Sequence, residues 1–233
     1  MRSAVVAFVI AIGVFIMLVG AGVHAGHNAI RTAMADERSG DSDNSETKSL
    51  SPAVGAFHIV NANGPINVKV TIGSTPSLTF QARADVLPLL TSEVKDGVLT
   101  IGMNDHGMSD IGDITATIVT PSIDGVTLNG SGNVDVDGVK STDFSAMLNG
   151  SGNLNAKGSA DAATFTVDGS GNIEADDLLS SATTVKIAGS GNAKVNASKK
   201  LEATIAGSGD IRYTGNPGTV NRSVFGSGSV EAE

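Results

Sequence analysis

Glycine-rich phrases are the first residues of this chain whose type and spacing suggest chemistry. The tripeptide Gly-Ser-Gly occurs six times, and glycine-rich turns cradle phosphate groups in nucleotide-binding proteins. A phosphate loop needs a lysine and a helix directly after the turn, whereas a strand-like alternation follows each of these phrases. A serine nucleophile is also disfavoured, because no Gly-x-Ser-x-Gly elbow is present and no histidine follows residue 106.

Four carboxylates could supply the acid pair of a polysaccharide-cleaving enzyme: Asp135, Asp137, Glu174 and Asp176. Lysines alternate with them along the repeats, which favours ionised carboxylates over the protonated form that a general acid needs. The chain has no tryptophan and one tyrosine for stacking on sugars. We therefore expect no catalytic residues and keep such an enzyme as the least favoured alternative.

Metal and cofactor sites are not expected either. The histidines His24, His27, His58 and His106 are isolated in the sequence, whereas histidine ligands normally arrive with partners. Calcium-binding glycine repeats have a nine-residue period with regular aspartates, which this chain lacks. The acidic residues, with Asp177 among them, are better interpreted as a solvated face.

Composition excludes several function classes. The net charge of the 233 residues is −9, which disfavours a nucleic-acid partner because phosphate binding needs clustered Lys and Arg. The absence of cysteine excludes disulfides, thiolate metal sites and a lipidated cysteine. With 3% aromatic residues, any core must be built largely from Val, Ile, Leu and Ala.

The first 25 residues are predicted to be a targeting segment. Arg2 precedes an unbroken apolar run over residues 4–23, and about 20 apolar residues suffice to span a bilayer. A cleaved signal peptide and an uncleaved membrane anchor both fit, and only an anchor would contact the membrane. Residues 26–52, rich in serine and acids, are predicted to be a flexible polar linker. In either case we expect the remainder to be exported to the periplasm, outer envelope or cell surface.

The spacing of the Gly-Ser-Gly phrases predicts the architecture of residues 120–233. Successive phrases start 20, 19, 20, 18 and 19 residues apart, a period typical of a solenoid and about half that of a propeller blade. Apolar alternation on both sides of each phrase predicts two short strands that flank a tight corner. The expected fold is an all-β parallel solenoid with rungs of about 19 residues, preceded by an N-terminal hydrophobic helix.

Stacked rungs predict columns of equivalent side chains. The residues after the six phrases form a polar column that we interpret as a structural ladder: Asn133, Asn153, Asn172, Asn192, Asp210 and Ser229. In the outward columns, charges of opposite sign are expected to be neighbours. One such column is Asp137, Lys157, Asp176 and Asn196, and another places Glu174 beside Lys194.

Residues 53–119 lack the phrase but carry strand patterns, so we expect irregular opening coils of the same body. Period-two alternation predicts strands near residues 56–60, 66–72, 78–82 and 114–119. A hairpin is expected around the Asp96-Gly97 turn. Residues 86–90, interrupted by Pro88, are expected to form a turn or a short helical piece.

Residues 55–233 resemble the family described as the autotransporter-adhesin head, or GIN domain. The resemblance rests on the segments 66–72, 98–101 and 114–121 and on the repeated Gly-Ser-Gly-Asn. It implies a right-handed parallel β-helix on an exported bacterial protein, an adhesive role, and no catalytic residues.

The expected function is a non-catalytic cell-envelope binding or adhesion module whose partner is an envelope or surface protein or glycan. The alternative is an envelope structural or self-assembling protein, since solenoid ends expose strand edges that invite a second copy. The charges of Arg222, Glu231 and Glu233 would blunt the last edge.

Overall fold

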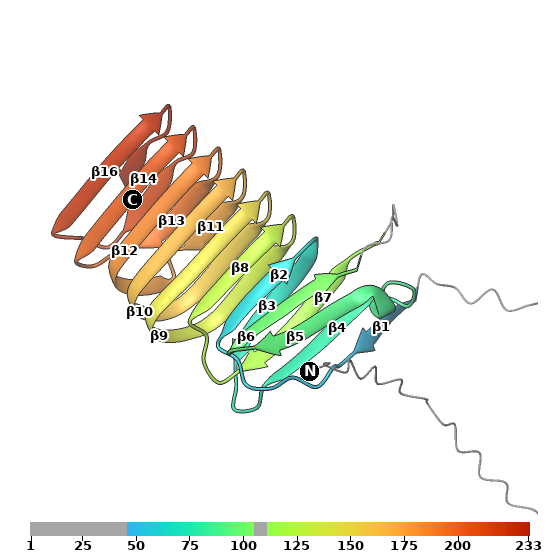
Figure 1. Cartoon of the computed structure of the whole chain (residues 1–233). Helices are drawn as coiled ribbons and strands as arrows, with labels where there is room; N and C mark the ends of the chain where they lie inside the picture. Colours follow the sequence, from blue (N-terminus) through green and yellow to red (C-terminus); the bar gives the residue numbers. More distant parts are fainter. Residues whose placement is uncertain (1–45, 105–110) are drawn as a thin grey trace, which may run out of the picture. The chain divides into compact units, whose positions relative to one another are not determined.

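The computed structural model describes residues 46–104 and 111–233 (Figure 1). The expected hydrophobic helix over 4–23, most of the expected linker, and His24, His27 and His106 lie outside these residues. Ser42–Glu233 form one compact unit with its own hydrophobic core. No helix in the described ranges is long and apolar enough to cross a membrane.

The unit is built almost entirely from strands, with one 3-10 helix, η1 (Leu87–Leu89). The strands are β1 (Thr47–Leu50), β2 (Ile59–Asn63), β3 (Ile66–Ile72), β4 (Ser77–Arg83), β5 (Leu90–Lys95), β6 (Val98–Met103), β7 (Ile114–Thr120), β8 (Gly125–Gly130), β9 (Asn133–Gly150), β10 (Asn153–Gly169), β11 (Asn172–Ala175), β12 (Leu178–Gly189), β13 (Asn192–Asn196), β14 (Lys200–Gly207), β15 (Ile211–Thr214), β16 (Thr219–Gly226) and β17 (Val230–Ala232).

Each regular coil has two long sides that meet at a Gly-Ser-Gly corner, and the opening strands continue these sides. The strands before the corners pair in parallel and form the pre-corner side, which runs from β6 through β2 and β8 to β12, β14 and β16. The strands after the corners form the post-corner side, from β7 and β3 to β11, β13, β15 and β17. The long strands β9 and β10 bend and contribute to both sides. This confirms the parallel solenoid and its 19-residue rungs.

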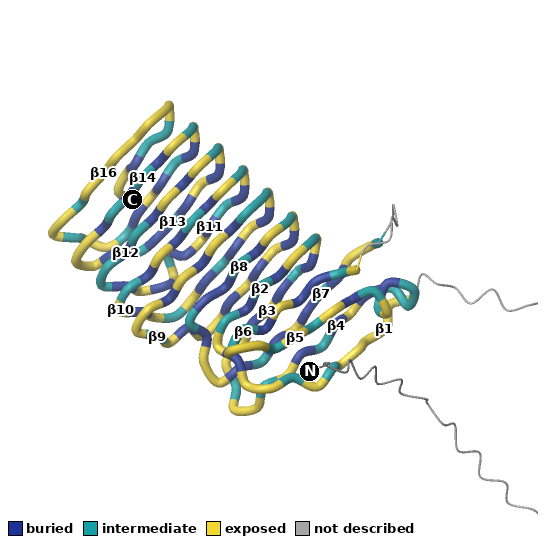
Figure 2. The backbone as a smooth tube through the Cα atoms, in the orientation of Figure 1, coloured by how far each residue is buried: buried dark blue, intermediate teal, exposed yellow. Residues whose placement is uncertain are grey.

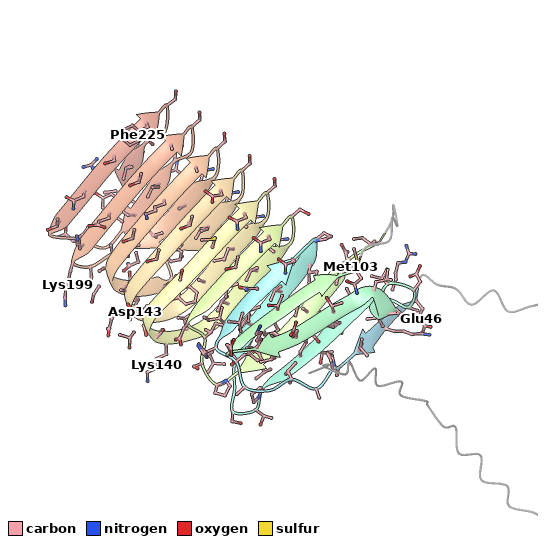
Figure 3. All side chains as sticks on the ribbon, viewed as in Figure 1. Glu46, Met103, Lys140, Asp143, Lys199 and Phe225 are labelled. Carbon is pink, nitrogen blue, oxygen red and sulfur yellow. The ribbon has the colours of Figure 1, made fainter. Side chains whose placement is uncertain are left out.

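A short third side, formed by β9, β10 and β12, closes the middle coils and was not foreseen from the sequence. In β10 the residues from Gly158 to Ala160 pair in register with Val139–Ser141 below and Leu178–Ser180 above. Lys140, Asp143 and Lys199 project into solvent along this edge (Figure 3). The register shift between Ala156 and Gly158 marks the bend that leads into it.

Alternate side chains point inward and fill the space between the sides, as the alternating burial in Figure 2 shows. The two largest neighbours are Phe144 and Phe165, whose rings meet edge-on with centroids 6.4 Å apart. In the register, Phe144 pairs with Ala163 and Phe165 pairs with Ala146. A large and a small residue thus alternate on adjacent coils, which lets two rings fit between strands spaced about 4.8 Å apart.

The opening coils do not stack in the order of the sequence. The coil of β2 and β3 lies between the coil of β6 and β7 on one side and that of β8 and β9 on the other. The strands β4 and β5 return antiparallel to β7 and β6, and β1 adds to β4. Thr47–Leu50, which we assigned to the linker, therefore extend the sheet. The hairpin at Asp96-Gly97 and the helical piece at η1 are confirmed.

The last coil leaves its inward residues uncovered. The inward column of Val126, Ala146, Phe165, Val185 and Ala203 is buried, but Arg222, next in the column, is exposed. Its Nη1 donates to the carbonyl oxygen of Val230 at 3.1 Å, so the guanidinium reaches across the coil. Nearby, Val224 is 40% exposed although its equivalents below are buried. Inward-pointing charge is a known protection of open sheet edges.

We therefore expect Arg222→Val to promote association through the end formed by β16 and β17. The substitution removes a charge that a second copy would have to bury without a partner, at a cost of several kcal/mol. Size-exclusion chromatography with light scattering, over roughly a hundredfold range of concentration, should show larger species for the variant than for the wild type. Ser223→Val, which adds an apolar residue to the same strand but keeps Arg222, is the control. Equal masses for Arg222→Val and wild type would contradict this role.

Candidate functional site

The corners have a backbone geometry that only glycine supports. The first glycine of each phrase has a positive φ, such as 133° at Gly189. The second is buried against the coil below in every phrase but the last: a Cβ on Gly152 would lie within 3.0 Å of the carbonyl oxygen of Gly132. The serines between them are exposed. The corners line one edge of the stack, at the arrowheads of β14 and β16 in Figure 1.

A seventh corner was missed in the sequence. Asn63-Gly64-Pro65-Ile66-Asn67 stacks directly under the first Gly-Ser-Gly corner, with the Gly64 N–H donating to the Asn129 carbonyl oxygen at 2.8 Å. Ile66 stands at the position of the second glycine, and its partner on the neighbouring coil is Ile114. The signal that could have revealed it is Asn-Gly-x-x-Asn, which the first two Gly-Ser-Gly corners share, at Asn129–Asn133 and Asn149–Asn153.

The polar column after the corners is a continuous hydrogen-bonded ladder. The Nδ2 atoms of Asn133, Asn153, Asn172 and Asn192 each donate to the Oδ1 of the Asn one coil below, at 2.9–3.1 Å, and the ladder starts at Asn67. Some of these oxygens also accept a backbone N–H from the coil above, as Asn172 Oδ1 does from Asn192 at 3.2 Å. This confirms the predicted structural ladder and extends it by one coil.

Asp210 and Ser229 end the ladder with a different pairing. The Asp210 N–H donates to Asn192 Oδ1, and Asp210 Oδ1 accepts from both the Oγ and the N–H of Ser229 at 2.8 Å. These hydrogen bonds from Ser229, with a smaller contribution from the charge of Arg212, hold the pKa of Asp210 below its ordinary value of 3.8.

Asp210→Asn should reduce the acid sensitivity of the fold. Because the folded pKa is the lower one, the ionised carboxylate stabilises the fold above pH 3.8, and this contribution disappears as the pH falls through the folded pKa. Urea unfolding at pH 7, 5, 4 and 3 should show that wild type loses more stability than the variant below pH 4. Glu93→Gln, which removes a carboxylate without a hydrogen bond in the described part of the chain, is the control. Equal acid losses in wild type and Asp210→Asn would contradict the assignment.

The four carboxylates considered for catalysis are distributed and do not pair. Asp135 and Glu174 lie in one outward column with Asn155 between them. Asp137 and Asp176 lie at the next outward position, on coils separated by the coil of Lys157. No two of the four are partners on adjacent strands, but Asp135 lines one cavity with Glu174 and another with Asp137.

The predicted charge columns are correct in part. Glu174 and Lys194 are cross-strand partners, as expected. Lys157 forms its ion pair with Asp177, at 3.1 Å, instead of with an acid of its own column. The hydrogen bond to Asp177 is the main cause that raises the Lys157 pKa above 10.5. Above Lys194 comes Arg212, so the alternation of sign ends with two adjacent cations.

The ladder and the charged column enclose a shallow trough along the post-corner side. Its walls are the outward residues of both columns, and its floor is the backbone of the inward residues between them, such as Ile173 and Ala193. Two cavities of about 280 and 380 Å³ form it. Glu174 lines both of them, and a third cavity of about 250 Å³ lies on the other side of the charged column, beside Asp137 and Lys157. We call this surface the trough.

Other candidate positions are not brought together. His58 is exposed and lies beside a separate cavity with Asp124 and Asp143 on the third side. Within residues 46–104 and 111–233, no three His, Asp or Glu side chains are grouped to hold a metal ion.

Sequence comparison now places the chain among known proteins. The profile of the family described as "Putative auto-transporter adhesin, head GIN domain" matches residues 56–217. The chain belongs to this GIN-domain family. No protein of curated function matches it in sequence.

Solved structures similar to this GIN domain share its fold at low sequence identity. A "putative adhesin" from Bacteroides fragilis is 22% identical with a TM-score of 0.66, over 81% of this chain and 97% of that one. A "putative adhesin" from Parabacteroides merdae is 21% identical with a TM-score of 0.52, over 82% and 97%. A "putative lipid binding protein" from Parabacteroides distasonis is 21% identical with a TM-score of 0.50, over 82% and 98%.

Proposed function

We propose that this GIN domain is a non-catalytic binding module of an exported protein, with an adhesive role at the cell envelope. The observation that carries the proposal is the trough. It places polar side chains of five successive post-corner strands in two rows, and no two of the acids considered for catalysis are partners on adjacent strands. Such a surface suits an extended partner that contacts several coils at once. The adhesin names of the family and of two similar structures support the same role.

A lipid ligand receives less support. The trough is lined by amide, carboxylate and ammonium groups, so an acyl chain would bury little apolar surface in it. The exposed apolar side chains of the described residues, such as Leu50, Leu179 and Phe225, belong to distant strands and form no shared cavity.

Self-assembly is the second candidate, and the open edges of β16 and β17 favour it. The inward Arg222 opposes it, as described above. Envelope binding therefore remains the first candidate function.

The test is retention of the purified unit, residues 42–233, on intact cells and on separated envelope glycans and envelope proteins of the source bacterium. This unit has its own core, so the preceding segment is not needed. We expect saturable retention on cells and on one of the envelope fractions. The same unit after thermal unfolding is the control. A folded unit that is retained on none of these would contradict the proposed function.

A further inference from the structure

The ladder gives one wall of the trough a uniform chemistry. Each side-chain amide carries two N–H donors, and in Asn153, Asn172 and Asn192 one of them is used within the ladder. The second has no acceptor among the described residues. The Oδ1 atoms of Asn153 and Asn172 are occupied by the amide of the next coil. This wall therefore offers solvent a row of N–H donors, one per coil, about 4.8 Å apart.

The opposite wall offers both hydrogen-bond donors and acceptors, and each of its positive side chains has a negative one beside it. From β10 to β15 it carries Asn155, Glu174, Lys194 and Arg212. Lys194 Nζ lies 3.9 Å from Glu233 Oε1, and Arg212 is the cross-strand neighbour of Glu231. Each cation thus has an acid beside it. A polyanion would meet Asp135, Glu174 and Asp210 in the trough, and a polycation would meet the two bases. A ligand without net charge avoids both repulsions.

The direction of the trough excludes a peptide bound as an added strand. The trough crosses the strands, whose backbone groups already bond to the coils above and below. An extended peptide needs a free strand edge for its own backbone. A partner in the trough must therefore be recognised through side chains. Hydroxyl groups can both donate and accept hydrogen bonds. They can therefore accept from the N–H groups of the ladder and bond to both the donors and the acceptors of the opposite wall.

We propose that the trough is a binding site for a neutral, linear glycan that lies along the axis of the solenoid, a proposal that rests on the binding function proposed above. Its hydroxyl oxygens accept from the free amide N–H groups of the ladder. Its hydroxyl hydrogens are donated to Glu174 and Asp210, and Arg212 and Lys194 donate to further hydroxyls. The strands from β9 to β15 span about 19 Å at the strand spacing, so several sugar units bind at once. Because the site has no aromatic platform, affinity comes from the number of units bound.

The first experiment follows the side-chain amide signals of Asn153, Asn172 and Asn192 by NMR in the labelled unit of residues 42–233. The probes are hexasaccharides and disaccharides of β-1,4-linked glucose, mannose and xylose, with polygalacturonate as the anionic comparison. We expect a neutral hexasaccharide to shift these signals and to bind at least tenfold more tightly than its disaccharide. Shifts located elsewhere, no gain with length, tighter binding of polygalacturonate, or no binding of any neutral glycan would overturn the proposal.

The second experiment compares two matched double variants. Glu174→Ala/Arg212→Ala removes one acid and one base from the trough, and Lys186→Ala/Glu202→Ala removes one of each from the pre-corner side. We expect at least tenfold weaker hexasaccharide binding and cell retention for the first variant and less than twofold change for the second.

Melting temperatures show whether each variant is folded. If the alanine pair unfolds, the shape-conserving variant Glu174→Gln/Arg212→Lys takes its place and should bind with an affinity between those of wild type and the control. Retention on cells that is unchanged in a folded trough variant would overturn the trough as the site and leave the proposed function standing. Absence of retention by the wild type would refute the function itself.

Discussion

Gly152→Ala should destabilise the fold by at least about 3 kcal/mol, because an added Cβ cannot be accommodated between two corners. It would lie within 3.0 Å of both the Gly132 carbonyl oxygen and a methyl carbon of Leu128. The oxygen belongs to the backbone of the coil below, so no side-chain rotation relieves the clash. The coils would have to separate, which would also break the adjacent ladder hydrogen bond from Asn153 to Asn133. Urea unfolding followed by circular dichroism measures the loss.

Gly218→Ala is the matched control for this substitution. Gly218 is exposed, and the nearest atom to an added Cβ is the Lys199 carbonyl oxygen at 3.9 Å, an ordinary contact. Its effect should stay within about 0.5 kcal/mol, since surface substitutions without a specific clash are nearly neutral. Similar stabilities for the two alanine variants would contradict the close approach of the corners.

Phe165→Ala should cost about 3–5 kcal/mol, the range for deleting a buried aromatic ring. Phe165 is 1% exposed, and its ring contacts that of Phe144 edge-on. Its column neighbours Ala146 and Val185 are small and are fixed by the strand register, so they cannot move in to fill the cavity. Both the lost burial and the unfilled cavity contribute to the loss. Chemical denaturation at neutral pH measures it.

Phe225→Ala removes the same ring from the surface, where Phe225 is 70% exposed. We expect a change of less than about 1 kcal/mol, because little apolar area leaves the interior. A cost for Phe225 equal to that for Phe165 would mean that the inward and outward faces of the strands are assigned wrongly.

The regular half of the fold could be predicted because its repeats constrain one another. A corner phrase that returns every 18–20 residues fixes the coil length. Apolar alternation around it then decides which face of each strand is buried. The register followed from this, as the pairing of Glu174 with Lys194 and the amide ladder from Asn133 to Asn192 confirm.

The opening half could be predicted only as separate strands. Period-two patterns identify a strand such as β3 but do not say which strand it pairs with. The coil of β2 and β3 therefore lies between coils that follow it in sequence, an order that no local pattern encodes. Residues Thr47–Leu50 were assigned to the linker because they belong to a stretch rich in serine and acids, and all four residues of β1 are exposed in the structure.

The candidate site was foreseen in its residues but not in its shape. The ladder column and the Glu174–Lys194 pair were both read from the repeats, yet the trough between them requires the two columns to be seen together. Arg212 was overlooked because it breaks the alternation of charge that we used as a guide. The place of Arg222 in the column above Ala203, by contrast, follows from the alignment of the repeats, and the strand register confirms it.

The stacking of the corners is the claim on which the ladder, the trough and the close glycine contacts all depend. A cysteine pair tests it directly, because the chain contains no cysteine of its own. Ser151→Cys/Ser170→Cys places two exposed thiols on adjacent coils, about 4.8 Å apart along the stack and within the range a disulfide can bridge. Ser131→Cys/Ser170→Cys places them two coils apart. Mild oxidation should form an intramolecular disulfide in the first pair and none in the second. Efficient bridging of the second pair, or only intermolecular bridges in the first, would contradict the stacked solenoid.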